Sequence, residues 1–244
     1  MKKAERFKYI SVSQTGKKRK INEDSVGIFH TESGLLFIVC DGLGGGLSGE
    51  FASMQAVKKI YNHFISSNVE DILLRIRTAV ENANLFIYQK SNGNLNFKGM
   101  ASTCELLLLN SASSYWAHVG DSRLYIYQNK KLKQLTKDNS IVQELIDVGK
   151  IKFRQAKKDY RINVVSKAIG DLESPSIDTS KMKLPTKHPY KFFICTDGVT
   201  AVVSDGELEE LLNSNDLQET STELQNIIER RGSPDNYSFV IVSP

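Results

Sequence analysis

Four short acidic motifs are spread along almost the whole chain, and they constrain its fold more than any other feature of the sequence. They are Asn22-Glu23-Asp24, Cys40-Asp41-Gly42, Thr196-Asp197-Gly198 and Asp235-Asn236. Three of them sit at or next to the end of an apolar, β-prone run, marked by Ile38-Val39, Phe193-Ile194 and Phe239-Val240. A carboxylate at the end of a buried strand is held rigidly, so ends that are distant in sequence can converge on one point. The pattern predicts strand ends that meet around a hard metal ion.

Length and composition are those of an ordinary soluble globular protein. The chain has 244 residues, of which 40% are hydrophobic and 25% charged, enough for a sizeable core. No linker rich in Pro, Gly or Ser divides it, so we expect a single domain over residues 1–244. No apolar run approaches the roughly 20 residues of a membrane span, and no signal-peptide segment follows the first residues. We therefore expect a cytoplasmic protein with no membrane partner.

The charge pattern limits the possible partners. A formal charge of +4 is too small to indicate nucleic acid, so no nucleic-acid partner is expected. Basic residues gather in two stretches, 17–20 and 150–161. Such stretches are most often solvated surface. The alternative is an anionic substrate or partner that is drawn to a site near both.

The three cysteines indicate core packing and not thiol chemistry. Cys40, Cys104 and Cys195 each lie in an apolar run, and they lack the spacing of a disulfide or zinc framework. Free cysteines of this kind are usually buried. A phosphatase that uses a cysteine nucleophile needs an arginine six residues later, and no arginine stands at any of the three corresponding positions.

The periodicity of apolar residues predicts blocks of strands separated by helices. Strands are expected over 9–13, 25–30, 35–40, 102–109, 115–119, 124–127, 177–184, 191–195 and 237–242. Helices are expected over 49–67, 70–89, 139–148, 205–212 and 221–230. Asp138 or Asn139 would cap the third helix and Gly149 would end it. The polar, basic stretch 150–160 is expected to be a surface flap. Paired helices between blocks of strands favour two stacked sheets covered by helices over a parallel βαβ sheet.

The residues around Asp41 favour binding of a cation through oxygen atoms. Asp41 is followed by Gly42-Leu43-Gly44-Gly45-Gly46, and glycine allows the backbone to approach a ligand closely. A main-chain carbonyl can then join the carboxylate on one ion. All-oxygen ligation selects Mg²⁺ or Mn²⁺ rather than Zn²⁺. The alternative, a phosphate-binding loop, is disfavoured because its Gly-Lys-Ser/Thr ending is absent.

Further motifs follow these in a fixed order along nearly the whole chain. The series opens with Thr15-Gly16, Arg19, Asn22-Glu23-Asp24-Ser25, Val39-Cys40-Asp41-Gly42-Leu43-Gly44-Gly45 and Gly49-Glu50. It continues with Gly99-Met100-Ala101-Ser102-Thr103, Ala117-His118-Val119-Gly120-Asp121-Ser122-Arg123, Leu135-Thr136-Lys137-Asp138, Ala168-Ile169-Gly170, Cys195-Thr196-Asp197-Gly198 and Asp235-Asn236. This series resembles that of the metal-dependent serine/threonine phosphatases of the 2C type, in their compact bacterial form.

The resemblance implies a fold, an activity and a set of cofactors. The fold is an α+β, four-layer α-β-β-α sandwich, with two mostly antiparallel central sheets flanked by helix pairs and a flap at about 139–170. The activity is hydrolysis of phosphoserine and phosphothreonine in phosphoproteins, and the cofactors are two Mn²⁺ or Mg²⁺ ions with a third, weaker ion. The partners are substrates of a serine/threonine kinase, and the protein is expected to be a monomer.

The resemblance also assigns ligands. Asp41 bridges two metals and the Gly42 carbonyl adds a ligand. Asp197 and Asp235 complete one metal, while Glu23 holds the other directly or through water. Asp121, together with Asp197, matches the site of the third ion.

Two metal ions explain the expected chemistry. Dications about 3.5 to 4 Å apart lower the pKa of a shared water, which then attacks phosphorus without a covalent enzyme intermediate. Arg19 matches the phosphate-binding arginine, and its planar fork of donors suits two phosphate oxygens. Lys18 or Lys20 is the alternative contact if the turn is shifted.

Other residues of the motifs are expected to have structural or supporting roles. Asp24 and Asn236 cap turns or support the ligands from behind. Arg123 is expected to form a structural ion pair, and His118 to be a core histidine with satisfied hydrogen bonds.

Departures from the family pattern leave a second function open. Leu43 stands where some members carry a histidine proposed as general acid, so a metal-bound water would supply the proton. Asn139 and Ala101-Ser102 also differ and are expected to tune the flap and the packing. The alternative is a pseudophosphatase or regulatory module that binds phosphoproteins. It is disfavoured because Asp41, Asp197 and Asp235 are all present, and unused clustered carboxylates repel one another.

Overall fold

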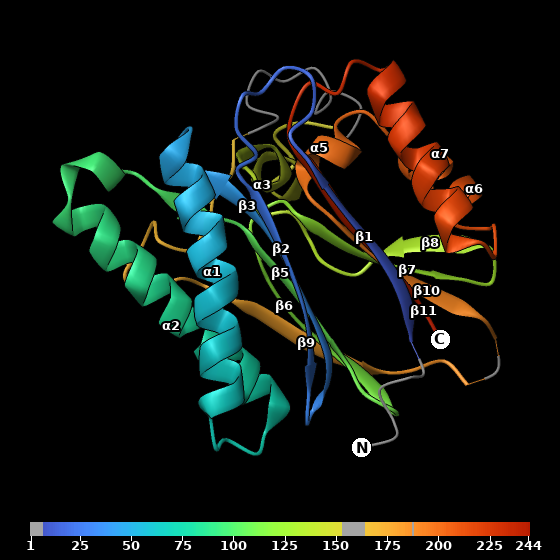
Figure 1. Ribbon diagram of the computed structural model, residues 1–244, viewed down its shortest axis with the longest axis horizontal. Helices are drawn as coiled ribbons and strands as arrows, with labels where there is room; N and C mark the ends of the chain where they lie inside the picture. Colours follow the sequence, from blue (N-terminus) through green and yellow to red (C-terminus); the bar gives the residue numbers. More distant parts are fainter. Residues whose placement is uncertain (1–6, 153–163, 187) are drawn as a thin grey trace.

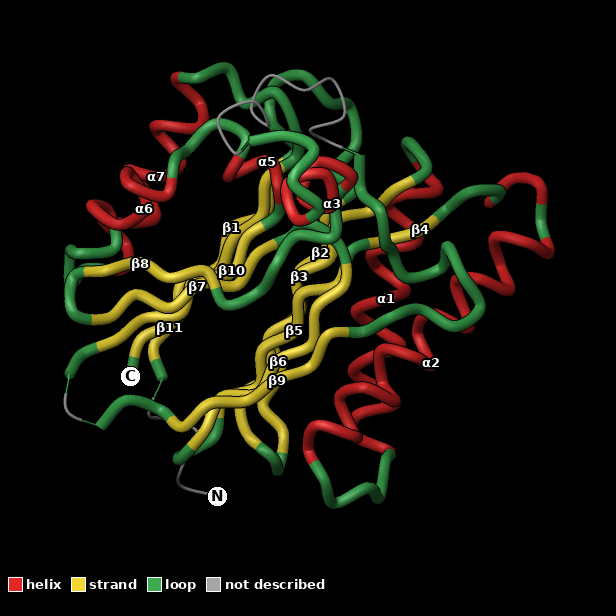
Figure 2. The backbone as a smooth tube through the Cα atoms, turned by 180° about the vertical axis from the view of Figure 1, so that it is seen from behind, coloured by secondary structure: helices red, strands yellow, loops and turns green. Residues whose placement is uncertain are grey.

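Two β-sheets packed face to face form the centre of the molecule, and helices cover the outer face of each. The structure is a computed structural model that describes residues 7–152, 164–186 and 188–244. Figure 1 shows α1 (Leu47–Ser66) and α2 (Ile72–Gly93) beside one sheet, and α6 (Asp205–Leu211) and α7 (Leu217–Arg230) beside the other. Figure 2 shows the same layers from behind. The expected four-layer sandwich of an α+β protein is confirmed.

The first sheet is antiparallel throughout its described strands. Its order is β2-β3-β5-β6-β9, with β4 paired to β3. The strands are β2 (Asp24–Thr31), β3 (Gly34–Leu43), β4 (Ala101–Ser102), β5 (Cys104–Leu109), β6 (Ser113–Val119) and β9 (Asp178–Lys183). The sequence predicted one strand over 102–109. The structure interrupts it at Thr103, whose side-chain oxygen accepts a hydrogen bond from the Asp41 amide.

The second sheet is also antiparallel and has the order β1-β11-β10-β7-β8. Its strands are β1 (Lys8–Gln14), β7 (Arg123–Gln128), β8 (Lys131–Gln134), β10 (Tyr190–Cys195) and β11 (Tyr237–Ser243). The sequence did not predict β8, which is short and polar. Asn129 and Lys130 connect it to β7 with φ values of 53° and 58°. Two consecutive left-handed residues are what a tight two-residue hairpin requires.

The helices differ from the prediction mainly at their ends. α7 begins at Leu217 rather than at 221, because the Asp216 carboxylate accepts hydrogen bonds of 2.8 and 3.1 Å from amides of the first turn. Two short elements were not predicted: a 3₁₀ turn, η2 (Leu95–Phe97), and one helical turn, α5 (Asp197–Thr200).

The helix predicted over 139–148 is α3 (Ile141–Asp147), and its predicted cap was wrong. Ser140 caps it through its hydroxyl. Asp138 is instead bound to Arg123, and the Asn139 side chain accepts a hydrogen bond from the Gly120 amide. Gly149 lies directly after the helix with φ 71°, as its predicted stop role requires.

Three apolar layers stabilise the sandwich. One lies between α1, α2 and the first sheet, one between the sheets, and one between the second sheet and α6, α7. Cys40 and Cys104 are fully buried in the first layer and Cys195 in the third, so the predicted core role of the cysteines is confirmed. Within the described ranges, no helix combines the length and apolar character needed to cross a membrane.

Candidate metal centre

The antiparallel sheets bring the acidic motifs to one end of the sandwich. Asp24 opens β2 and lies directly opposite Asp41, near the end of β3, in the strand register. Asp197 follows β10, while Asp235 precedes β11, and these strands are joined there by a 3.0 Å bond from the Thr196 amide to the Ser238 carbonyl. This is the end at which α5 lies in Figure 1. The convergence predicted from the strand ends is therefore observed.

Polar contacts from β4, β5 and the β6–β7 loop fix the backbone of Asp41. Its amide donates to the Thr103 hydroxyl at 2.8 Å, and its carbonyl accepts from the Thr103 amide at 2.8 Å and the Ser102 hydroxyl at 3.0 Å. The Thr103 hydroxyl lies 2.8 Å from that of Ser122. Sequence reasoning assigned no site role to these hydroxyls. The motifs that contain these hydroxyls could have indicated a site role, because they consist of small and polar residues and lie beside Asp41 and Asp121 in the fold.

The glycine after Asp41 is required by the close approach of α1. A Cβ atom on Gly42 would lie 2.0 Å from the Gly49 carbonyl oxygen and 2.7 Å from that of Glu23. The Gly42 amide donates to the Glu23 carbonyl at 3.1 Å, and a Cβ atom on Gly49 would lie 2.8 Å from Glu23 Oε1. The first turn of α1 therefore packs directly on Asp41-Gly42 and Glu23.

Asp24 and Asn236 connect the parts of the site that come from different sheets. The Asp24 carboxylate accepts a 2.9 Å bond from the hydroxyl of Thr196 on the other sheet. The Asn236 side-chain oxygen accepts from the Glu23 amide at 2.9 Å, and its nitrogen donates to the carbonyls of Thr15 and Ile21. Asn236 thereby holds the loop that carries Arg19 and Glu23, which is the geometry that a supporting role requires.

Arg19 lies at the open edge of the acidic cluster. Its Nη2 donates to Asp235 Oδ2 at 2.9 Å, and its Nη1 lies 3.9 Å from Glu23 Oε2. The hydrogen bond to Asp235 raises the pKa of Arg19 above its ordinary value, against the opposing effect of burial. About half of the side chain is exposed. Lys18 and Lys20 are exposed on either side, so all three cations can be reached from solvent.

The carboxylates of the site raise one another's pKa values. Desolvation, followed by the charges of Asp24, Asp197 and Asp121, holds the pKa of Asp41 well above its ordinary range. Desolvation and the charge of Asp235 raise the pKa of Asp197, while its neighbour Asp41 lowers it. Asp41 and Asp197 nevertheless keep part of their surface open. A cation entering there would relieve this repulsion.

Asp121 joins the same electrostatic cluster from the β6–β7 loop. Burial and the charge of Asp197 raise its pKa to about 7. The loop turns at Gly120, which has φ 113° and whose amide donates to the Asn139 side chain at 3.0 Å. Arg123, two residues on, binds both oxygens of Asp138 at 2.7 to 3.1 Å, so the predicted structural ion pair is observed.

His118 lies behind the site in the core, as predicted. Only 1% of its surface is exposed. Its Nδ1 lies 2.8 Å from Glu105 Oε2, and its Nε2 lies 2.9 Å from the Lys137 carbonyl. Sequence reasoning missed Glu105, because an acidic residue inside an apolar strand gives no sign of its partner.

The oxygen atoms at this end of the sandwich suit Mg²⁺ or Mn²⁺. Among the described residues, Glu23 Oε1 and Asp24 Oδ1 are buried without a hydrogen-bond partner. The donor set consists of carboxylate and backbone oxygens, which hard cations prefer. No three acidic, His or Cys side chains in the described ranges already close around a single point. The residues present therefore fit these ions by their chemistry: carboxylate oxygens without a partner lie at the same end of the sandwich as the partly open Asp41 and Asp197.

The predicted flap over 139–170 is tied to the site at both of its described ends. The Ile141 amide donates to the Val164 carbonyl at 3.0 Å, and the Ser166 amide to the Asn139 carbonyl at 2.8 Å. Ile169 forms a bridge to Ser102. The centre of the predicted flap, with most of its basic residues, lies outside the described residues.

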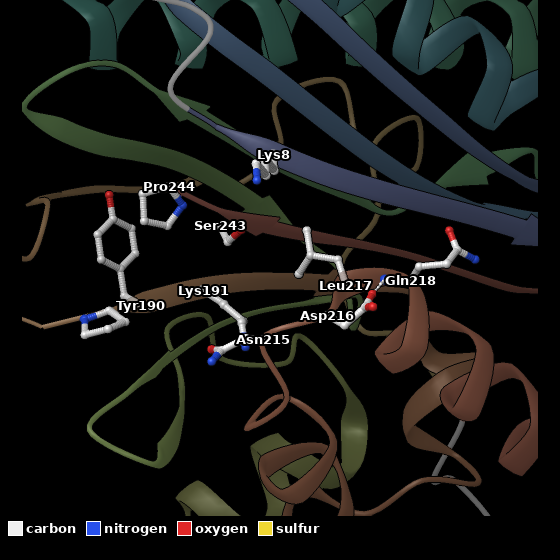
Figure 3. A pocket seen from close by; sticks show the side chains of 10 residues that line it. Lys8, Tyr190, Lys191, Asn215, Asp216, Leu217, Gln218, Ser243 and Pro244 are labelled. Carbon is white, nitrogen blue, oxygen red and sulfur yellow. Dashed lines mark hydrogen bonds between the residues drawn. The ribbon is translucent and has the colours of Figure 1, made fainter.

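A separate pocket of about 650 Å³ lies at the opposite end of the second sheet, where β11 ends (Figure 3). Its lining includes Lys8, Lys191, Asp216 and Ser243. Lys191 donates to the Leu212 carbonyl at 2.6 Å and to the Ser214 carbonyl. Its ammonium group thus satisfies carbonyls after α6, and none of the predicted site residues reaches this pocket.

Known proteins match the chain along almost its whole length. A family model described as protein phosphatase 2C matches residues 15–236. The serine/threonine phosphatase stp of Listeria monocytogenes serovar 1/2a is 30% identical over 233 residues, which cover 93% of this chain and 92% of that protein.

Solved structures agree in fold. A serine/threonine phosphatase from Staphylococcus aureus has a TM-score of 0.91 at 28% identity and covers 98% of this chain and 95% of its own. The catalytic domain of the serine/threonine phosphatase PstP, in complex with two manganese ions, has a TM-score of 0.83 at 28% identity over 97% of both chains. The chain belongs to the protein phosphatase 2C family of serine/threonine phosphatases.

Proposed function

We propose that the chain hydrolyses phosphoserine and phosphothreonine in phosphoproteins, using water activated by two Mn²⁺ or Mg²⁺ ions. The observation that carries the proposal is the meeting of carboxylates from the two sheets. Asp24 faces Asp41 in the strand register, and the hydroxyl of Thr196, the residue before Asp197, donates to Asp24 at 2.9 Å. The charges of Asp24 and Asp197 raise the pKa of Asp41, so such a cluster is unfavourable without a cation. The relative with two manganese ions supports the number of metals. Residues 1–244 are proposed to act as one cytoplasmic, monomeric catalytic domain.

Each ligand has a distinct proposed role. Asp41 and the Gly42 carbonyl would help to hold both ions. Asp197 and Asp235 would hold one of them, and Glu23 the other. Asp121, whose pKa is raised by burial and by the charge of Asp197, would hold a third, weaker ion. When bound, the ions lower the pKa of water and neutralise charge on the phosphoryl oxygens.

Arg19 binds the phosphoryl group. Its guanidinium is now turned to Asp235 at 2.9 Å, a contact that cations on the carboxylates would weaken. The freed donors then bind two phosphoryl oxygens and stabilise the charge that develops in the transition state. Because Leu43 offers no imidazole, water supplies the proton to the departing alkoxide.

Substitution of Asp41 tests the proposal. We expect Asp41→Asn to lose at least about a thousandfold in kcat on a phosphothreonine peptide, and to lose tight Mn²⁺ binding in calorimetry, because the bridging charge is gone. Glu229→Gln is the matched control, since Glu229 pairs with Lys17 outside the cluster. Chelation should stop turnover by the unmodified protein. Turnover that survives both chelation and Asp41→Asn contradicts the mechanism.

A pseudophosphatase is not favoured, because Asp41, Asp197 and Asp235 are all present. Its signature would be tight binding of a phosphopeptide with no release of phosphate in saturating Mn²⁺. The proposed partners are phosphoproteins made by a serine/threonine kinase. Comparing the phosphoproteomes of cells with and without the protein would identify them.

A further inference from the structure

The first turn of α1 carries an exposed leucine directly beside the metal centre. The exposed fraction of Leu47 is 72%, and that of Leu95 in η2 is 89%. These are the two most exposed large apolar residues in the described part of the chain. Single exposed leucines are common and need no explanation. Two exposed leucines on adjoining segments beside a reaction centre do call for an explanation, because a contiguous exposed apolar surface marks binding sites.

Two contacts place the leucines together. The Ser48 hydroxyl, one residue after Leu47, donates to the carbonyl of Asn96, one residue after Leu95, at 3.1 Å. On the same two segments, the rings of Phe51 and Phe97 are stacked with centroids 4.9 Å apart and an interplanar angle of 20°. Leu47 and Phe51 are four residues apart on α1 and so share a helix face. Leu47 and Leu95 therefore lie on two segments that a hydrogen bond and a stacked aromatic pair hold together.

The leucine pair adjoins the place where the substrate must lie. A Cβ atom on Gly49, two residues after Leu47, would lie 2.8 Å from Glu23 Oε1. Leu47 and Gly49 both belong to the first turn of α1, so Leu47 lies on the helix turn that contacts a proposed ligand. Figure 1 shows the first turn of α1 at the same end of the molecule as α5. When a phosphorylated polypeptide binds with its phosphate at the metal centre and Arg19, the residues that flank the phosphorylated one lie near the first turn of α1.

We propose that Leu47 and Leu95 form a docking surface for an apolar residue of the substrate polypeptide, close in sequence to the phosphorylated serine or threonine. The proposal rests on the phosphatase function above and adds a substrate preference to it. An extended chain advances about 3.3 to 3.6 Å per residue, so a residue that reaches the leucines lies within a few positions of the phosphorylated one. Lys18 and Lys20, exposed beside Arg19, offer the substrate a contrasting, basic surface.

Paired phosphopeptides test the docking surface. Two phosphothreonine peptides of equal length differ only at positions two to four on both sides of the phosphothreonine, where one carries leucine and the other serine. We expect the unmodified protein to prefer the leucine peptide by about tenfold or more in kcat/KM, the scale expected for burying one leucine side chain. The double variant Leu47→Ser, Leu95→Ser should lose this preference.

Two controls make the result specific. Ile65→Ser changes an exposed side chain (53%) at the other end of α1, about 27 Å away for 18 residues of helix, and should keep the preference. p-Nitrophenyl phosphate has no flanking residues, and its Mn²⁺-dependent turnover by the double variant reports an intact metal site.

Several outcomes overturn the proposal. They are equal turnover of both peptides by the unmodified protein, a preference that survives in the double variant, or a preference lost equally in Ile65→Ser. If light scattering shows that the double variant dissociates a dimer while its peptide preference is unchanged, the face is an interface between copies. Absence of Mn²⁺-dependent turnover of any phosphate ester by the unmodified protein would instead contradict the phosphatase function.

Discussion

Glu105 and His118 form a buried ion pair one strand away from Asp41. Glu105 lies on β5, opposite Val39 of β3 and His118 of β6 in the strand register, and neither side chain of the pair is more than 1% exposed. Burial raises the pKa of Glu105 to about 7, while His118 lowers it. The pKa of His118 is raised because Glu105 outweighs the effect of burial. Each group therefore depends on the other for its charge.

Replacing Glu105 by Gln should lower the pKa of His118 below 6.5, because burial then acts alone. We expect a loss of about 3 to 5 kcal/mol in the free energy of unfolding, as for other broken buried pairs. The pKa of Glu105 is higher in the folded than in the unfolded chain, so its stabilising contribution is complete below pH 4.5 and is lost as pH rises through about 7. The loss caused by the substitution should thus be larger at pH 5 than at pH 8.

Histidine NMR titration and guanidinium unfolding at the two pH values check this prediction. His63→Gln is the control variant, since His63 lies in the last turn of α1 and outside the pair. A His118 pKa that does not fall in Glu105→Gln would show that the pair does not set its charge.

At the scale of elements, the contact of α1 with β3 makes one glycine irreplaceable. We expect Gly42→Ala to lose at least about tenfold in Mn²⁺ affinity and in turnover, because its Cβ would lie 2.0 Å from the Gly49 carbonyl and must push the first turn of α1 away from Glu23. Gly206→Ala is the matched control: its Cβ meets nothing within 4 Å and it lies inside α6.

Alanine should stabilise α6 by about 0.5 to 1 kcal/mol. Calorimetric titration with Mn²⁺ and thermal unfolding separate the two effects. Equal Mn²⁺ affinities for Gly42→Ala and the unmodified protein would mean that α1 accommodates the added Cβ atom without weakening metal binding.

The sequence predicts whether a segment forms a helix or a strand far better than it predicts the residues at which that helix or strand begins and ends. The stripes of α1 and α2 and the apolar runs of β3 and β10 carry strong periodic signals, so they were found. β8 was missed because it is short and polar and is held by pairing with β7. The cap of α3 was misassigned because three polar residues precede the helix, and tertiary contacts of Asp138 and Asn139 leave Ser140 as the cap.

The site could be predicted in part. The strand-end acids converge because antiparallel register brings them to one edge. The contacts of Thr103, Ser122 and Thr196 could not be predicted, since they depend on how loops from different sheets meet. The bond from Arg19 to Asp235 was likewise out of reach, because it crosses 216 positions of sequence.

At the scale of the whole molecule, the candidate metal centre joins the two sheets. Asp41 and Glu23 belong to the first sheet and its entry loop, while Asp197 follows β10 and Asp235 precedes β11 of the second sheet. Cations bound by both should stabilise the sandwich as one unit. We expect Mn²⁺ at 100 times its Kd to add about 2.7 kcal/mol to the free energy of unfolding, in one cooperative transition.

Unfolding in Mn²⁺ and in chelator, followed by both tryptophan fluorescence and circular dichroism, measures this effect. Trp116 lies on β6 of the first sheet and packs in the apolar layer between the sheets, so its fluorescence reports that interface. Asp197→Asn should lose most of the gain. Two separated transitions in Mn²⁺ would show that the sheets are not coupled through the site.

The position of β11 near the end of the sequence decides when the site can form during synthesis of the chain. The strand lies between β1 and β10, so it joins the N-terminal strand to the rest of the second sheet. Asp235 immediately precedes it. While a ribosome still holds these residues, β1 has no partner strand and one proposed ligand is missing. With Asp235 as a proposed ligand, we expect the activity to start only when residues 235–243 have emerged and docked, so that a partly synthesised chain does not remove phosphate from other proteins.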